Sequence, residues 1–354
     1  MILLTGGYTQ RVGEDIEGRA KGISAYAFRP HDGDLRFMGY APADNPSYLI
    51  TSRRQGNTIV YAVRELAAAA GAGVTAHRLE ERNGKAVFTL LSEQPLEADD
   101  PCHLTVMGDF LVVAGYTSGT LHVLPIHPDG SLGPTVSRLP LLGGGPDDER
   151  QQQAHAHCVA CDPRRSRLYV TDLGSDLVRV FDLSDTGTLH PLPDLNLTIP
   201  PGGGPRHIAL HPNGDLAVVN CEMKAKVHLV DLTTHPLRIV TTENYLPERV
   251  ADRASGAAVR LTPDGRYAYV SDRAFGVITQ LSLQARKHKL RFQDTVESGG
   301  DKPRDFNLSP DGKWLVAANM QSHNLAVFAV GSKGELTHYR TVTGVPSPTC
   351  VGWG

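Results

Sequence analysis

The sequence is poor in the features that mark membrane-spanning, exported or disulfide-linked proteins. No segment approaches about 18 uninterrupted apolar residues, the length that a transmembrane helix requires. The apolar run within residues 1–8 carries no basic region and is too short for a signal peptide. We therefore expect a soluble, cytoplasmic protein. The cysteines form an odd set in a chain of 354 residues, which argues against a disulfide framework and for reduced core thiols; they are Cys102, Cys158, Cys161, Cys221 and Cys350.

Charge of one sign is not concentrated anywhere in the chain. The formal net charge is −3, both signs are interspersed, and no block of five like charges occurs. Nucleic acids and membrane surfaces attract basic patches, so this pattern predicts binding to neither. The Gly-x-Ser-x-Gly elbow and the phosphate-binding loop are absent as well. We expect a small-molecule partner and a monomer or weak homo-oligomer.

Glycine and proline, in contrast, are abundant. The chain has 36 glycines and 24 prolines, while 40% of its residues are hydrophobic and 21% are charged. Such a chain can bury a core but is interrupted by frequent turns. This composition favours many short strands over long helices.

A hairpin pattern at residues 202–222 recurs along the chain. It consists of a Gly-rich entry, a short alternating strand, a Pro-Asn-Gly turn and a second strand that ends in a polar cluster. A third alternating strand and a more variable fourth segment follow each complete hairpin, as in a four-stranded antiparallel blade. Related patterns return about every fifty residues, which is typical of propeller blades; they begin at Asn45, Asp100, His155, Ala257, Lys302 and Ser347.

The last of these units stops after one strand, within residues 347–353. Three strands are left over at the beginning of the chain, at residues 3–8, 22–28 and 35–40. Closing a ring with one C-terminal inner strand and three N-terminal strands would hide the exposed edges of an open array. The sequence therefore predicts an all-β, seven-bladed β-propeller, with residues 1–354 forming one domain.

Two polar, turn-rich segments, residues 10–21 and 141–153, are expected to form exposed loops near one face. Residues 64–70 contain an Ala-rich run with some helical character, but Gly71 and Gly73 end it quickly. We interpret this run as a connection between two strands, with a short helical turn as the alternative.

Polar residues gather at the two ends of each hairpin that face the same side of the ring. In a hairpin, the start of the first strand and the end of the second are neighbours across the ladder. A repeat protein needs the same apolar residues in each unit, but it does not need different charged residues to converge on one rim. The first position supplies Cys102, His157, Arg206 and Arg304, and the second supplies Glu222, Arg273 and Gln321.

Several of these segments resemble one known family. They are Asn-Pro-Ser-Tyr-Leu at 45–49, His-Ala-His-Cys-Val at 155–159, Gly-Gly-Gly-Pro-Arg-His at 202–207, Val-Asn-Cys-Glu at 219–222, Val-Ser-Asp-Arg at 270–273 and Lys-Pro-Arg-Asp-Phe at 302–306. Over nearly the whole chain the sequence is similar to the seven-bladed propeller lactonases, the group of propeller-type 6-phosphogluconolactonases and fungal carboxy-cis,cis-muconate cyclases.

The resemblance implies a catalytic site made of His157, Arg206, Glu222 and Arg273. It also shows one departure, because many relatives carry an acidic residue where this chain has Ala258. The activity implied is the opening of a sugar-acid lactone such as 6-phosphogluconolactone, in the carbohydrate metabolism of the pentose phosphate pathway. No metal and no cofactor is expected.

The residue types fit that chemistry. Water attacking a lactone carbonyl generates an oxyanion, which Arg206 and Arg273 could stabilise, or they could hold an anionic group of the substrate. Glu222 or His157 could act as general acid or base, and two nearby arginines should lower the pKa of Glu222 unless burial offsets them. Further candidates for binding the anionic substrate are His103, Asn220, Arg304 and Gln321.

Other interpretations remain open on the sequence alone. The pair Arg206 and Glu222 could be a salt bridge that only pins its blade. The site could instead serve a cyclase or cycloisomerase acting on a carboxylated muconate-like acid, or a non-catalytic propeller that binds a ligand or protein. A calcium-dependent lactonase would need more carboxylates and amides than converge here. A zinc site within residues 155–161 is disfavoured, because positions 158 and 161 of a strand point to opposite faces.

Overall fold

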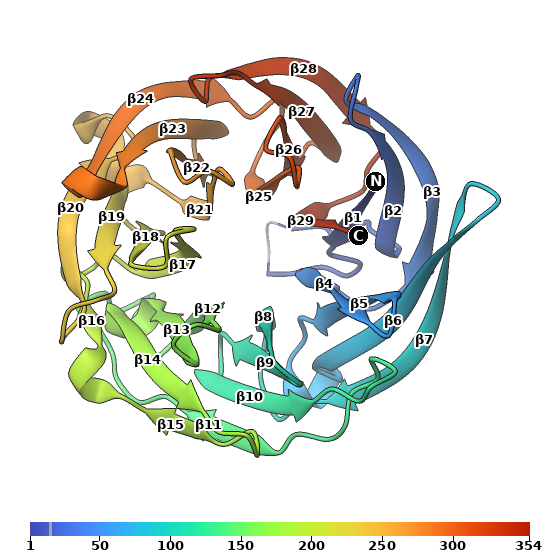
Figure 1. Cartoon of the computed structure of the whole chain (residues 1–354), viewed down its shortest axis with the longest axis horizontal. Coiled ribbons are helices and arrows are strands. Elements are labelled where there is room, and N and C mark those ends of the chain that lie inside the picture. Colours follow the sequence, from blue (N-terminus) through green and yellow to red (C-terminus); the bar gives the residue numbers. More distant parts are fainter. Residues whose placement is uncertain (14–15) are drawn as a thin grey trace.

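The computed structural model of the protein describes residues 1–13 and 16–354 and contains seven β-sheets arranged in a ring. The inner strand of each sheet lies beside the central channel, and the fourth strand lies at the circumference (Figure 1). The predicted all-β, seven-bladed propeller is thereby confirmed. The expected loop at residues 10–21 includes residues 14–15, which lie outside the described residues.

The blades follow one another around the ring in chain order. The closing blade consists of β29 (Pro348–Trp353), β1 (Ile2–Gly7), β2 (Gly22–Arg29) and β3 (Asp34–Pro42). The second contains β4 (Leu49–Arg54), β5 (Asn57–Arg64), β6 (Gly73–Arg82) and β7 (Lys85–Pro95). The third contains β8 (Pro101–Met107), β9 (Phe110–Gly115), β10 (Thr120–Pro125) and β11 (Ser137–Pro140).

The fourth blade contains β12 (Ala156–Asp162), β13 (Arg167–Asp172), β14 (Leu177–Leu183) and β15 (Leu189–Pro191), with the short β16 (Leu197–Thr198) also paired to β14. The fifth contains β17 (Pro205–Leu210), β18 (Leu216–Cys221), β19 (Lys226–Asp231) and β20 (Arg238–Asn244). The sixth contains β21 (Gly256–Leu261), β22 (Tyr267–Asp272), β23 (Val277–Gln284) and β24 (Lys289–Glu297). The seventh contains β25 (Pro303–Leu308), β26 (Trp314–Asn319), β27 (Asn324–Val330) and β28 (Leu336–Thr343).

The ring closes as the sequence predicts, with one C-terminal strand and three N-terminal strands in one sheet. Strand β29 pairs antiparallel with β1, and Leu3 lies opposite Trp353. Both chain ends therefore lie in the same blade, as Figure 1 shows. This pairing covers the inner edge of β1, and β29 takes the place of the inner strand in this blade.

The hydrophobic core is divided into seven clusters, one at each interface between neighbouring blades. At the interface between the closing and second blades, for example, Leu4 and Ile23 pack with Val60 and Ala62. The second strand of a blade is covered on both faces, so β18 is buried along its whole length. The fourth strands face solvent on one side, and β28 accordingly consists of exposed and half-buried residues only.

Helical structure among the described residues is limited to short 3₁₀ segments at η1 (Ala68–Ala70), η2 (Leu173–Ser175), η3 (Pro193–Leu195), η4 (Glu248–Arg253) and η5 (Ala285–Lys287). The alternative of a helical turn near residue 70 is therefore correct, and Gly71 ends it with a φ of 96°. No helix in the described part of the chain is long and apolar enough to cross a membrane.

Candidate active site

One backbone hydrogen bond is repeated in all seven blades at the mouth of the channel. In each blade, the residue just after the second strand donates its N–H to the carbonyl that precedes the inner strand, over 2.8–3.2 Å. We call these seven donors the rim set: Tyr8, Glu65, Tyr116, Leu173, Glu222, Arg273 and Met320.

A second set consists of seven residues, one in each blade, that lie two positions after the residue whose carbonyl accepts this hydrogen bond. In six blades the pairing of inner and second strands shifts at this point, so the residue bulges out of the ladder. A β-bulge redirects a side chain and is common beside active sites. We call these residues the inner set: Ser47, Cys102, His157, Arg206, Ala257, Arg304 and Thr349.

Proline precedes five of the inner-set residues, for example Pro205 before Arg206 and Pro303 before Arg304. Proline has no N–H to give to a ladder and is tolerated where pairing begins or is interrupted. The sequence thus marks the bulge position directly.

This register corrects one expected equivalence. The position that matches Glu222 and Arg273 in the seventh blade is Met320, because its N–H bonds the Lys302 carbonyl over 3.1 Å. Gln321 follows it and is exposed. The sequence-based alignment was therefore displaced by one residue in this blade.

Glu222 is the centre of the charged cluster. Its Oε2 accepts a hydrogen bond from Nε of Arg206 over 2.8 Å and lies 3.1 Å from Nη2 of Arg273. Nε2 of His157 lies 3.8 Å from the same oxygen. All four residues predicted to be catalytic are thus brought together from three adjacent blades.

A fifth member of the cluster, Arg150, was not expected. Its Nη2 donates to Oε1 of Glu222 over 2.6 Å and to the Tyr116 hydroxyl over 3.1 Å. Arg150 belongs to the loop at residues 141–153, between β11 and β12, which has no strand periodicity. The only signal in the sequence was that this polar loop was expected near one face.

The charges of this cluster fix its protonation states. Burial alone would raise the pKa of Glu222, but Arg273, Arg206 and Arg150 outweigh it and hold that pKa well below its usual range. Burial and the neighbouring Arg273 lower the pKa of Arg206 to about 10. Burial, together with Arg206, holds the pKa of His157 well below 6.5. At neutral pH the cluster therefore contains an ionised carboxylate, charged arginines and a neutral imidazole.

A second carboxylate occupies the corresponding rim position of the second blade. Glu65 accepts hydrogen bonds from the hydroxyls of Tyr8, over 2.7 Å, and Ser47, and its Oε1 lies 3.6 Å from Nη2 of Arg304. The Arg304 guanidinium also lies 5.2 Å from the centre of the Tyr8 ring. Glu65 follows its second strand as Glu222 does, but in the sequence it lies within the run 64–70, whose composition indicates a connection or helical turn rather than a site.

A small cavity lies among the inner-set side chains. Its volume is about 10 Å³, close to the space of one water molecule. Polar groups surround it on several sides, and its lining residues are Ser47, Tyr48, Cys102, His157, Arg206, His207, Arg304, Asp305 and Thr349. This cavity, which His157 and Arg206 line, is therefore too small for a sugar.

The residues that follow the inner set form a deeper layer. Asp305 belongs to it and accepts a hydrogen bond from Arg260 over 2.9 Å. Ala258, the position singled out in the sequence as a departure from the family pattern, is completely buried in the same layer of the neighbouring blade.

Two predicted substrate-binding residues also lie in buried positions. His103 stacks on Tyr48, with ring centres 4.1 Å apart, and its Nε2 lies 3.3 Å from Sγ of Cys158. Asn220 is fully buried; its Oδ1 accepts from the His207 N–H over 3.2 Å and its Nδ2 donates to the Ala257 carbonyl over 3.1 Å. Of the four binding candidates, only Arg304 lines the small cavity.

Among the described residues, no group of three or more His, Cys, Asp or Glu side chains is placed to hold a metal ion. The cysteines of the segment 155–161 are separated accordingly: Cys158 approaches His103, whereas Cys161 packs against the core between the third and fourth blades.

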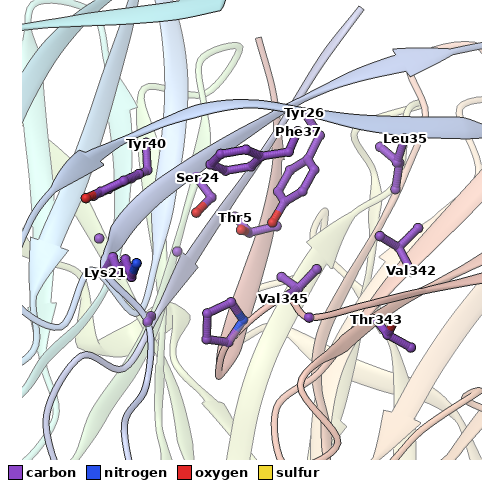
Figure 2. Close-up of a pocket in the computed structure, with 15 residues that line it drawn as sticks. Thr5, Lys21, Ser24, Tyr26, Leu35, Phe37, Tyr40, Val342, Thr343 and Val345 are labelled. Atoms are coloured by element: carbon purple, nitrogen blue, oxygen red, sulfur yellow. The ribbon is translucent and has the colours of Figure 1, made fainter.

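A larger cavity, of about 320 Å³, lies apart from this cluster, between the closing and seventh blades. Figure 2 shows the rings of Tyr26 and Phe37 beside Thr5 and Ser24, with Val345 on the opposite side. None of its lining residues belongs to the rim or inner sets, and Lys21 is the charged member of the lining.

Fold and site together define a seven-bladed propeller with arginines and a histidine gathered around one carboxylate at the mouth of its channel. A model of the family described as "Lactonase, 7-bladed beta-propeller" matches residues 2–353. The chain belongs to this family.

Individual relatives match between about three quarters and nearly all of the chain. The 6-phosphogluconolactonase of Bacillus subtilis is 32% identical over 350 residues, 97% of each chain. The 6-phosphogluconolactonase of Sodalis glossinidius is 30% identical over 74% of this chain and 75% of its own. The structure of the periplasmic gluconolactonase of Pseudomonas aeruginosa superposes with a TM-score of 0.88 at 28% identity, covering 99% of this chain and 98% of that one.

Proposed function

We propose that this protein is a metal-independent, cytoplasmic lactonase that hydrolyses 6-phosphogluconolactone to 6-phosphogluconate. The observation that carries the proposal is the cluster itself, in which a neutral imidazole and several guanidinium groups surround one carboxylate. The relatives named 6-phosphogluconolactonase supply the substrate.

His157 is the proposed general base. Its low pKa keeps the imidazole neutral at pH 7, so one ring nitrogen is available to accept a proton. Nδ1 has no hydrogen-bond partner among the described protein groups, and the other nitrogen faces Glu222. A carboxylate that orients a histidine base is a common catalytic arrangement.

Glu222 is the proposed positioning residue rather than the base. Three arginines hold its charge, so it accepts a proton from water far less readily than a neutral imidazole does. Its carboxylate fixes the guanidinium groups and faces His157 Nε2. The small polar cavity beside His157 is of a size to hold the attacking water.

In the proposed reaction, the water oxygen attacks the lactone carbonyl while His157 takes a proton from the water. The carbonyl oxygen becomes an oxyanion, which Arg206 and Arg273 stabilise through charged N–H groups. When the carbonyl re-forms, the bond to the ring oxygen breaks, and the proton returns from His157 to that oxygen. The product is the open hydroxy acid.

The test is hydrolysis of 6-phosphogluconolactone by the purified protein in EDTA, with 6-phosphogluconate detected by a coupled NADP-dependent dehydrogenase. We expect a rate well above spontaneous ring opening. His157→Asn should lower kcat by about 10²–10⁴-fold, the range for loss of a general base. The control is His190→Asn, on the exposed strand β15. Absence of catalysis, or activity that requires a metal, would refute the proposal.

A further inference from the structure

The arginines around Glu222 differ in how far a ligand can reach them. The side chain of Arg206 is 2% exposed and that of Arg273 is 16% exposed, whereas that of Arg150 is 43% exposed. Nη1 of Arg206 also donates to Nε2 of His207 over 3.1 Å, which holds the guanidinium of Arg206 in place. Arg150 is therefore the guanidinium of this cluster most open to a ligand in the channel mouth.

The backbone that carries Arg150 is held in place. The neighbouring Gln151 is almost completely buried and donates from Nε2 to the Leu173 carbonyl over 2.8 Å. Oδ1 of Asp147 accepts the N–H of Arg150 over 2.8 Å, and Nε2 of Gln153 donates to the Thr117 carbonyl over 2.6 Å. The exposed side chain, rather than the loop, is thus the part that can change partners.

The charge around Glu222 is unbalanced. Arg150, Arg206 and Arg273 surround this single carboxylate, which leaves two positive charges in excess. A phosphate monoester carries about −1.5 to −2 charges at neutral pH and matches the fork of a guanidinium. The cluster is therefore suited to a phosphorylated ligand.

Geometry gives the phosphate an outer position. The cavity that His157 and Arg206 line is of about water size, so a lactone ring must lie outside it, on the exposed side of the cluster. In a 6-phosphorylated δ-lactone the phosphate is joined to the carbonyl carbon through the ring oxygen and C5 and C6, so it lies near the carbonyl but outside its contacts. Arg150 donates to Oε1 of Glu222, and Arg206 donates to Oε2 of the same carboxylate. Their guanidinium groups therefore lie close together, as the carbonyl and the phosphate of this lactone do.

We propose that Arg150 is the residue that selects a phosphorylated lactone over an unphosphorylated one, by transferring its guanidinium from Oε1 of Glu222 to the substrate phosphate. This inference rests on the proposed lactonase function. It assigns the inner arginines to the carbonyl and the loop arginine to the phosphate. Of the similar proteins, one is named 6-phosphogluconolactonase and another gluconolactonase, so the phosphate is a feature in which these names differ.

The test compares kcat/KM for 6-phosphogluconolactone and for D-glucono-1,5-lactone in Arg150→Gln and in the wild type. We expect the ratio of kcat/KM for the phosphorylated lactone to kcat/KM for the unphosphorylated one to fall by about 10–100-fold, the effect of one or two charged hydrogen bonds that only the phosphate can make. Arg150→Lys should recover part of the loss, because it restores charge without the fork. Arg266→Gln, an exposed arginine paired with Asp264 far from the mouth, is the matched control and should change neither value.

The outcomes separate the two proposals. If the wild type hydrolyses neither lactone, the proposed function itself fails. If the wild type is active but Arg150→Gln lowers kcat/KM for both substrates equally, or for neither, Arg150 does not select the phosphorylated substrate. The proposed lactonase function is not affected by that result. Thermal melting of each variant shows whether the comparison is made on folded protein.

Discussion

Removing the charge of Glu222 is the most demanding test of the cluster. In Glu222→Gln, the side chain keeps its shape, but the guanidiniums of Arg150, Arg206 and Arg273 lose their shared carboxylate. Arg206 is buried and would remain as an uncompensated charge. Breaking a buried ion pair from one side costs about 3–5 kcal/mol. With an unfolding entropy of about 2.1 cal/mol/K per residue, this corresponds to a fall in Tm of roughly 4–7 °C for a chain of this length.

The pH dependence of this difference gives a second, independent measure. The pKa of Glu222 in the folded protein lies below its unfolded value of about 4.3. Its contribution is therefore complete above about pH 4.3 and is lost as pH falls through the folded pKa. Denaturant unfolding of the variant and the wild type should differ by a constant free energy from pH 8 to pH 5 and converge in more acidic solution.

The control for this experiment is Glu297→Gln, which removes a carboxylate from the exposed end of β24. It should leave the free energy of unfolding within about 0.5 kcal/mol of the wild type. The reasoning is refuted if Glu222→Gln is as stable as this control at pH 7. It is also refuted if the variant retains wild-type kcat, since the arginines would then not need the carboxylate to hold their positions.

Two further predictions concern ionisation. Because the pKa of His157 is lowered, the imidazole stays neutral until the pH falls below 6.5. We therefore expect kcat/KM to be constant between pH 8 and 6.5 and to decline only in more acidic solution. A decline of kcat/KM that begins above pH 7 would exclude His157 as the base. Burial raises the pKa of the Cys158 and Cys161 thiols to about 11, and Cys102, Cys221 and Cys350 are buried with raised pKa values. Ellman's reagent at pH 8 should therefore modify at most one thiol of the native protein and all five thiols in denaturant. Rapid labelling of several thiols in the native protein would contradict this packing.

The blades could be predicted because local signals agreed with one another. Pro-Asn-Gly and Pro-Asp-Gly turns between alternating strands specify hairpins, and each hairpin fixes which of its ends meet. Arg206 and Glu222 belong to one hairpin, so their contact follows from its register. The convergence of His157 and Arg273 required only that the blades close into a ring.

The features of the site that could not be predicted depend on the exact register of the backbone and on the conformation of a loop. In the seventh blade, the polar Gln321 suggests the position equivalent to Glu222 in the sequence. The repeated N–H to carbonyl hydrogen bond shows that the equivalent position is Met320. Glu65 was masked by the Ala-rich run that follows it. Arg150 lies in a loop without periodicity, and its reach to Glu222 depends on the burial of Gln151, which composition alone does not indicate.

The repeated hydrogen bond at the mouth has a consequence for how such a site can diversify. Because main-chain atoms set the seven rim positions, exchanging one side chain there leaves the backbone of the other six unchanged. The apolar clusters that hold the ring together lie between the blades and do not depend on the charged residues of the mouth. A propeller of this kind can therefore acquire a new reaction or a new substrate by substitutions at its mouth, while the arrangement of its blades is kept.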